Sequence, residues 1–316
     1  MNRSLRAGAG AGLLALAYAA AVAGARRPRR AGLSEASVEA AMDRQFQGTA
    51  PRHRYLGSAG GRTHLIDMGA GPRATLVFLS GMGGCPAAYH DLLDELSRDR
   101  RVVAVDRFGT GLSTGLRGQG HPRNSWVGQV EAVVTSLGLA PVDLVGHSLG
   151  GFVAGALAVE RPELVRRVVL LSPVGVVRDH PWSWTPALLP GALHLAAALA
   201  WGRHLTGAAE GPAGPDPCQL AADRWWGDSD LNSIARLIGP RGFRQETLLL
   251  PELGLLQDRI CLIWGDRDRQ VPLQAAQREL LSYPALHLEV LPGAGHLVPF
   301  ERPGEVAQAI RGWLDA

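Results

Sequence analysis

Lysine is absent from this chain of 316 residues, and the 32 residues of the lysine-plus-arginine total are all arginine. Together with 40 glycines and 21 prolines, this bias is typical of a GC-rich genome and identifies no chemistry. Charged residues make up only 19% and hydrophobic residues 46%, which excludes a disordered or collagen-like chain. The chain can therefore bury a sizeable core, in one large domain or in one domain with an insert.

Cysteine is also scarce. The three cysteines, Cys85, Cys218 and Cys261, are odd in number and lie far apart in the sequence. This spacing excludes a zinc knuckle and a disulfide framework, so we expect free thiols. The sequence implies no metal and no organic cofactor.

Positive charge in excess is confined to the amino terminus. Residues 1–30 hold six arginines and no acidic residue, whereas the remaining 26 arginines face 29 acidic residues. The rest of the chain thus has a formal charge of −3, although the whole chain has +3. A nucleic-acid partner is not expected from this distribution.

Residues 7–25 form a run of 19 uncharged residues dominated by alanine and glycine. Its length is close to that of a membrane-spanning helix, and we expect membrane association through this segment. Two arginines precede the run and four follow it, which favours a single-pass anchor with the downstream domain on the cytoplasmic side. A signal peptide cleaved after Ala23-Gly24-Ala25, giving a secreted protein, and a disordered tail are the alternatives.

Beyond residue 61 the sequence alternates short β-rich runs with helical ones, which predicts an α/β protein with a mostly parallel sheet flanked by helices. We expect residues 31–60 to be a linker, residues 61–173 and 257–316 to form the core, and residues 174–256 to be an inserted cap. The cap region holds five of the eight tryptophans and an apolar stretch at 187–205 that predicts a lid helix. The predicted strands are 63–68, 75–79, 102–106, 142–145, 168–171, 260–264 and 286–291, and the predicted helices are 87–96, 126–137, 149–160, 273–281 and 305–314.

Residues 146–150, Gly-His-Ser-Leu-Gly, match the G-x-S-x-G pattern. The pattern needs a tight strand-to-helix turn that exposes the serine oxygen, and Ser148 is preceded by an apolar strand and followed by a helix of small residues. A second match at 111–115 centres on Ser113, but the glycine-rich sequence after it cannot start a stable helix. Ser148 is therefore the candidate nucleophile.

A serine nucleophile needs a base and a carboxylate that orients the base. Two polar loops follow predicted strands downstream of Ser148: one contains Asp266 and Asp268, and the other ends at His296. Ligands of an open α/β sheet bind where its strands end at their carboxyl side, so both loops are candidates for the same site.

These motifs together resemble the α/β-hydrolase fold serine hydrolases. The resemblance rests on GHSLGG at 146–151, G-x-x-D-x-x-x-P at 265–272, GAGH at 293–296 and D-x-x-G-x-G-x-S at 106–113, and it covers about residues 60–316. The last motif also accounts for the second serine pattern.

The resemblance implies that Ser148 is the nucleophile, His296 the general base and Asp268 the acid, with Asp266 as the competing acid in the same loop. It also implies an oxyanion hole built from the backbone N–H groups of Met82 and Leu149. Where the family usually has His-Gly before this hole, the chain has Ser80-Gly81, so the hydrogen bonds that hold the loop must differ. We interpret His147 as structural, because the neighbouring serine must point away from it.

The expected function is hydrolysis of a carboxylic ester by acyl transfer, with an apolar or lipid-like ester as the substrate. The family's serine triads also support C–C bond hydrolysis, thioester hydrolysis and perhydrolysis. A membrane-tethered binding protein without turnover is the alternative from another class.

Overall fold

The computed structural model describes residues 34–58, 61–82, 84–115, 122–176 and 249–316. The strands are β1 (Arg52–Ser58), β2 (Gly61–Met68), β3 (Leu76–Leu79), β4 (Val102–Val105), β5 (Thr114–Gly115), β6 (Val142–His147), β7 (Val165–Leu171), β8 (Ile260–Gly265) and β9 (His287–Leu291). The α-helices are α2 (Glu35–Asp43), α3 (His90–Leu96), α4 (Pro122–Ser136), α5 (Leu149–Glu160), α10 (Leu250–Leu253), α11 (Leu273–Leu280), α12 (Val298–Glu301) and α13 (Pro303–Leu314). Short 3-10 helices are η1 (Pro86–Tyr89), η2 (Pro162–Leu164) and η4 (Gly254–Arg259).

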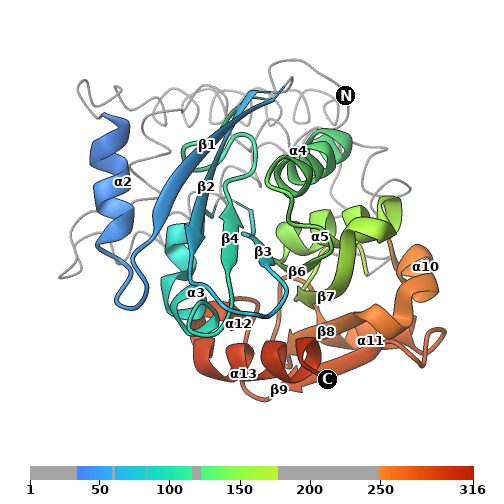
Figure 1. Cartoon of the computed structure of the whole chain (residues 1–316). Helices are drawn as coiled ribbons and strands as arrows, with labels where there is room; N and C mark the ends of the chain where they lie inside the picture. Colours follow the sequence, from blue (N-terminus) through green and yellow to red (C-terminus); the bar gives the residue numbers. More distant parts are fainter. Residues whose placement is uncertain (1–33, 59–60, 83, 116–121, 177–248) are drawn as a thin grey trace, which may run out of the picture.

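The strands form one sheet in the order β1-β2-β4-β3-β6-β7-β8-β9, with β5 paired to β2. The six strands β3, β4, β6, β7, β8 and β9 run parallel to one another. The β1–β2, β2–β4 and β2–β5 pairs are antiparallel. The carboxyl ends of the parallel strands therefore meet at one edge of the sheet, and the loops that follow them lie together there (Figure 1).

Helices cover both faces of the sheet (Figure 1). Side chains of α4, α5, α10 and α11 pack in one core with alternate strand residues such as Val77 and Leu79, and those of α2, α3, α12 and α13 pack in the other with Leu76 and Phe78. Strands that are buried on both faces have continuous apolar sequences, and these strands could therefore be predicted from the sequence.

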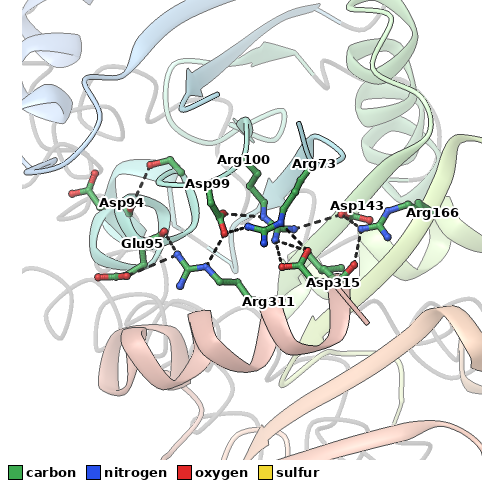
Figure 2. A network of polar contacts seen from close by, with 11 residues as sticks. Arg73, Asp94, Glu95, Asp99, Arg100, Asp143, Arg166, Arg311 and Asp315 are labelled. Carbon is green, nitrogen blue, oxygen red and sulfur yellow. Dashed lines mark hydrogen bonds and ion pairs between the residues drawn. The ribbon is translucent and has the colours of Figure 1, made fainter. Parts of the chain in front are cut away.

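An ionic network lies at the opposite, amino-terminal edge of the parallel strands (Figure 2). The fully buried Arg100 donates from Nη2 to both carboxylate oxygens of Asp315, at 2.9 Å each, just after α13 ends. Arg166 donates to Asp143 at 2.6 Å and to the carbonyl of Leu314 at 2.9 Å. These charges fix the end of α13 against the sheet, so we assign them a structural role.

Each of the seven predicted strands overlaps an observed one, and the α/β class with a mostly parallel sheet is confirmed. The predicted linker 31–60 contains α2 and the edge strand β1, which pairs with β2 over its whole length. Most of the predicted cap, including its lid helix at 187–205, lies outside the described residues, as does the predicted anchor at 7–25. Within the described ranges, no helix has the length and apolar character that crossing a membrane requires.

The expectation of three free thiols was wrong. Cys261 is a buried free thiol in β8, but Cys85 is disulfide-bonded. Burial raises the pKa of the Cys261 thiol to about 12, which keeps it protonated and unreactive.

Candidate active site

Ser148 occupies the turn between β6 and α5. Its backbone has φ 51° and ψ −114°, a conformation that non-glycine residues rarely adopt and that costs free energy. Two hydrogen bonds to neighbouring chain segments hold it: the N–H of Ser148 donates to the carbonyl of Leu171 at 2.9 Å, and its carbonyl accepts from the N–H of Val174 at 3.2 Å. The turn is thus maintained by the strand that lies beside β6.

The glycines that flank Ser148 are required by close backbone contacts. A Cβ atom on Gly146 would lie 2.4 Å from the carbonyl oxygen of Gly150, and one on Gly150 would lie 2.2 Å from the carbonyl oxygen of Leu79. Both distances are far below van der Waals contact. The sequence pattern therefore reflects the crowding of this turn against β3.

Ser148, His296 and Asp268 come together at the carboxyl edge of the sheet. Nε2 of His296 lies 3.0 Å from Oγ of Ser148, and Nδ1 of His296 lies 2.8 Å from Oδ2 of Asp268. The three residues are 8%, 6% and 4% exposed, so all three are buried. With Nδ1–H donating to the carboxylate, the lone pair on Nε2 faces the serine hydroxyl and can accept its proton.

Asp268 is held by its own loop. Its Oδ1 accepts the backbone N–H groups of Gln270 and Val271, both at 2.8 Å, which leaves Oδ2 for His296. The competing Asp266 is exposed and accepts the N–H of Gly293 at 2.7 Å, in the turn that leads to His296. The structure thus brings Asp268 to the imidazole and leaves Asp266 to fix the turn.

Met82 and Leu149 lie in loops that follow neighbouring parallel strands. Leu149 is the first residue of α5, so its N–H has no acceptor within the helix, and Met82 follows β3, whose last residue pairs with Gly146. Both residues therefore lie in loops at the carboxyl edge of the sheet, the edge at which Ser148 lies.

The loop that carries Met82 is held without the histidine that the family usually has there. The hydroxyl of Ser80 donates to the carbonyl of Gly84 at 2.9 Å. The buried Arg107 donates from Nη2 to the carbonyl of Gly81 at 2.8 Å. The side chains of Ser80 and Arg107 thus supply hydrogen bonds that hold this loop.

Ser113, the centre of the second serine motif, is not part of this site. It is 2% exposed, and its hydroxyl donates to the carbonyl of Asp106 at 2.6 Å while accepting the N–H of His64 at 2.8 Å. Tyr89 was not predicted as a site residue, but its hydroxyl accepts the N–H of Gly81 at 2.8 Å and lies 2.9 Å from Nδ1 of His147. No local pattern marks Tyr89, because its partners are distant in the sequence.

The chain has sequence similarity to known hydrolases. Residues 76–309 match the model of the "Alpha/beta hydrolase family". The chain is 31% identical over 287 residues to the 2-hydroxy-6-oxo-2,4-heptadienoate hydrolase of Pseudomonas putida, covering 83% of this chain and 96% of that protein. It is 26% identical over 264 residues to carboxylesterase YbfK of Bacillus subtilis, covering 82% and 86%.

A solved structure shares the fold. The naproxen esterase (carboxylesterase NP) of Bacillus subtilis superposes with a TM-score of 0.68 at 20% identity, covering 88% of this chain and 96% of that one. At this identity the likeness concerns the fold alone.

Proposed function

The chain belongs to the alpha/beta hydrolase family and is a hydrolase, and from this premise we propose that it cleaves carboxylic esters by acyl transfer through Ser148, His296 and Asp268. The observation that carries the proposal is the continuous hydrogen-bonded chain from Oγ of Ser148 through the imidazole to the carboxylate. A hydroxyl, a base and an orienting acid in this order form the arrangement that activates a serine.

In the first step the oxygen of Ser148 bonds to the ester carbonyl carbon while its proton moves to Nε2 of His296. The imidazolium then gives this proton to the leaving alcohol oxygen as the C–O bond breaks, which leaves an acyl-serine. A water molecule, deprotonated by His296, attacks the acyl carbon, and the acid is released with Ser148 restored. Asp268 stabilises the imidazolium in both steps.

The negative oxygen that develops on the carbonyl needs donors that are already in place. We assign this role to the N–H groups of Met82 and Leu149, and removing one such donor typically costs about 2.7–4 kcal/mol of transition-state stabilisation. Because both donors are backbone groups, the loops that carry them determine their direction.

Hydrolysis of a C–C bond beside a ketone is the second candidate. It is favoured by the relative at 31% identity, whose named substrate, 2-hydroxy-6-oxo-2,4-heptadienoate, carries a ketone and a carboxylate. A carboxylate substrate needs a cationic partner. Arg107 does not suit this role, since it is fully buried and donates to the carbonyls of Ser80 and Gly81.

We further propose an apolar or lipid-like ester. The support is compositional: residues 174–256 hold five of the eight tryptophans, which suits a cover over an apolar acyl or alcohol group. Most of that region lies outside the described residues.

The disulfide at Cys85 bears on the compartment. Disulfides persist in oxidising compartments and are rare in the cytosol. The disulfide at Cys85 therefore favours a secreted protein. The arginines of residues 1–30 instead predict a domain on the cytoplasmic side of the membrane. Sequencing the amino terminus of the mature protein tests this: a start at about residue 26 supports cleavage, and a retained segment 7–25 supports the anchor.

The substrate class is tested by measuring kcat/KM on 4-nitrophenyl esters of two to sixteen carbons and on 2-hydroxy-6-oxo-2,4-heptadienoate, with Ser148→Ala as the control. Turnover of esters that rises with chain length supports the proposal. Turnover of 2-hydroxy-6-oxo-2,4-heptadienoate alone supports C–C hydrolysis. Strict preference for charged or sugar-like esters contradicts the proposal of an apolar substrate. No turnover and no reaction with a fluorophosphonate would indicate a binding protein.

A further inference from the structure

The loop that carries Met82 and the loop that carries His296 are joined by a chain of hydrogen bonds through two buried side chains. The N–H of Gly81 donates to the hydroxyl oxygen of Tyr89 at 2.8 Å, and that hydroxyl lies 2.9 Å from Nδ1 of His147. Nε2 of His147 lies 2.9 Å from the carbonyl oxygen of His296. Tyr89 is 3% exposed and His147 is fully buried, so water does not replace these contacts.

The direction of every hydrogen bond in this chain is fixed by chemistry. A carbonyl only accepts, so Nε2 of His147 must carry a proton. Burial, and secondly the charge on His296 when it is protonated, lower the pKa of His147 to about 3, so the ring is neutral and Nδ1 has no proton. The hydroxyl of Tyr89 therefore donates to Nδ1 while its oxygen accepts from Gly81. Each donor has one acceptor.

The same loop is held from its other side by Arg107. The carbonyl of Gly81 and the N–H of Met82 belong to one planar trans peptide and point in opposite directions. Because Arg107 donates to this carbonyl at 2.8 Å, it also fixes where the N–H of Met82 points. Space for these contacts depends on glycine, since a Cβ on Gly81 would lie 2.9 Å from Nδ1 of His147.

We propose that Tyr89 and His147, together with Arg107, are positioning residues that hold the oxyanion donor Met82 in a fixed relation to the base His296. The inference rests on the proposed function, because Met82 and His296 act together only if an acyl-transfer step takes place between them. All three positioning residues are buried. Their effect reaches the reaction through the backbone of Gly81 and the carbonyl of His296.

Tyr89→Phe tests the link to Gly81, since it removes only the hydroxyl. On an ester substrate we expect kcat to fall about 10- to 100-fold with KM within about twofold, because the oxyanion donor acts on the transition state and not on the bound substrate. Phe78→Leu is the matched control. The ring of Phe78 packs on Tyr89 with centroids 4.9 Å apart, but Phe78 takes no part in the hydrogen bonds that link Gly81 to His296. The substitution should reduce stability and leave kcat unchanged.

Two substitutions at His147 test its two hydrogen bonds separately, the one to Tyr89 and the one to the carbonyl of His296. The amide of glutamine reaches about as far as Nε2, so His147→Gln keeps the donor to His296 and loses the acceptor for Tyr89. The amide of asparagine reaches about as far as Nδ1, so His147→Asn does the reverse. We expect the double variant Tyr89→Phe/His147→Gln to match Tyr89→Phe within about twofold in kcat, because both break one link.

Several results overturn the inference. Unchanged kcat in folded Tyr89→Phe does so, as do additive losses in the double variant. If Tyr89→Phe fails to fold, unchanged kcat in His147→Gln overturns the inference instead. Wild-type protein with no turnover and no fluorophosphonate labelling overturns the proposed function instead. The hydrogen bonds of Tyr89 and His147 are then tested by nitrogen NMR of labelled histidine. A His147 that is charged, or that carries its proton on Nδ1, between pH 5 and 8 rejects the proposed hydrogen-bond directions.

Discussion

Nε2 of His296 lies 3.0 Å from Oγ of Ser148, although 148 positions separate the two residues in the chain. The parallel sheet brings them together, because the loops after β6 and β9 both leave its carboxyl edge. The ionic contacts of Arg100 and Asp315 lie at the other edge, where they hold α13. Stability and proposed chemistry therefore depend on opposite ends of the same strands.

The two aspartates of the loop after β8 should differ sharply when changed to asparagine. Asp268→Asn should lower kcat on the order of 10⁴-fold, because the amide cannot hold His296 with its proton on Nδ1. Asp266→Asn keeps an oxygen for the N–H of Gly293 and should change kcat by less than about twofold. Steady-state kinetics of both variants decide the assignment, and equal losses would contradict it.

Glycine-to-alanine substitutions should report the crowding of the serine turn. Gly150→Ala should destabilise the protein by at least about 3 kcal/mol, since its Cβ would lie 2.2 Å from the carbonyl oxygen of Leu79. Gly128→Ala, in α4 with nothing within 4 Å of its Cβ, should instead stabilise by about 0.5–1 kcal/mol. Urea unfolding of the two variants checks both signs, and a mild effect at Gly150 would reject the packing described here.

Stability should fall at acid pH because of His147. Its pKa is lowered from 6.5 to about 3 in the folded protein, so the unfolded chain binds a proton that the folded one does not. The contribution is fully present above pH 6.5 and is lost at up to about 1.4 kcal/mol per pH unit as pH falls toward 3. Tyr89, His296 and Asp268 face the same ring or its neighbours.

Because those groups remain in His147→Gln, comparing the two proteins isolates the ring of residue 147. The free energy of unfolding, measured in urea at pH 7, 6 and 5, should decline less steeply in the variant than in the wild type. Parallel curves would show that the ring does not stay neutral in the folded protein.

Thiol chemistry should distinguish the cysteines. In denatured, unreduced protein a thiol reagent should modify Cys261, which is free, and leave Cys85, which is disulfide-bonded, unmodified. Reduction before denaturation should make Cys85 reactive as well. Modification of Cys85 without reduction would reject the disulfide.

The sequence predicted those parts of the fold whose signals are local. The helix 149–160 was predicted with the bounds that the structure gives it, because a strand, a G-x-S-x-G turn and a run of small residues follow one another. The strand β1 was missed, since Arg52–Ser58 lies at the sheet edge, begins with three polar residues and lacks an apolar run. Ser148, Asp268 and His296 were selected through motifs, and their contact depends on the sheet.

The contacts that hold the site were not predictable in this way. Tyr89 and His147 are 58 positions apart and meet only because η1 packs beside β6. The role of Arg107 was not predictable either, because a sequence pattern does not show which carbonyl a buried guanidinium will contact. The disulfide at Cys85 left no signal either, since widely spaced cysteines do not indicate pairing.

The central claim is that Ser148 is the nucleophile, and the most direct test is to label the protein with a fluorophosphonate and map the modified peptide by mass spectrometry. We predict a single adduct on Ser148, which is lost in Ser148→Ala and retained in Ser113→Ala, the matched change in the second serine motif. An adduct on another residue, or ester hydrolysis that survives in Ser148→Ala, would contradict the account.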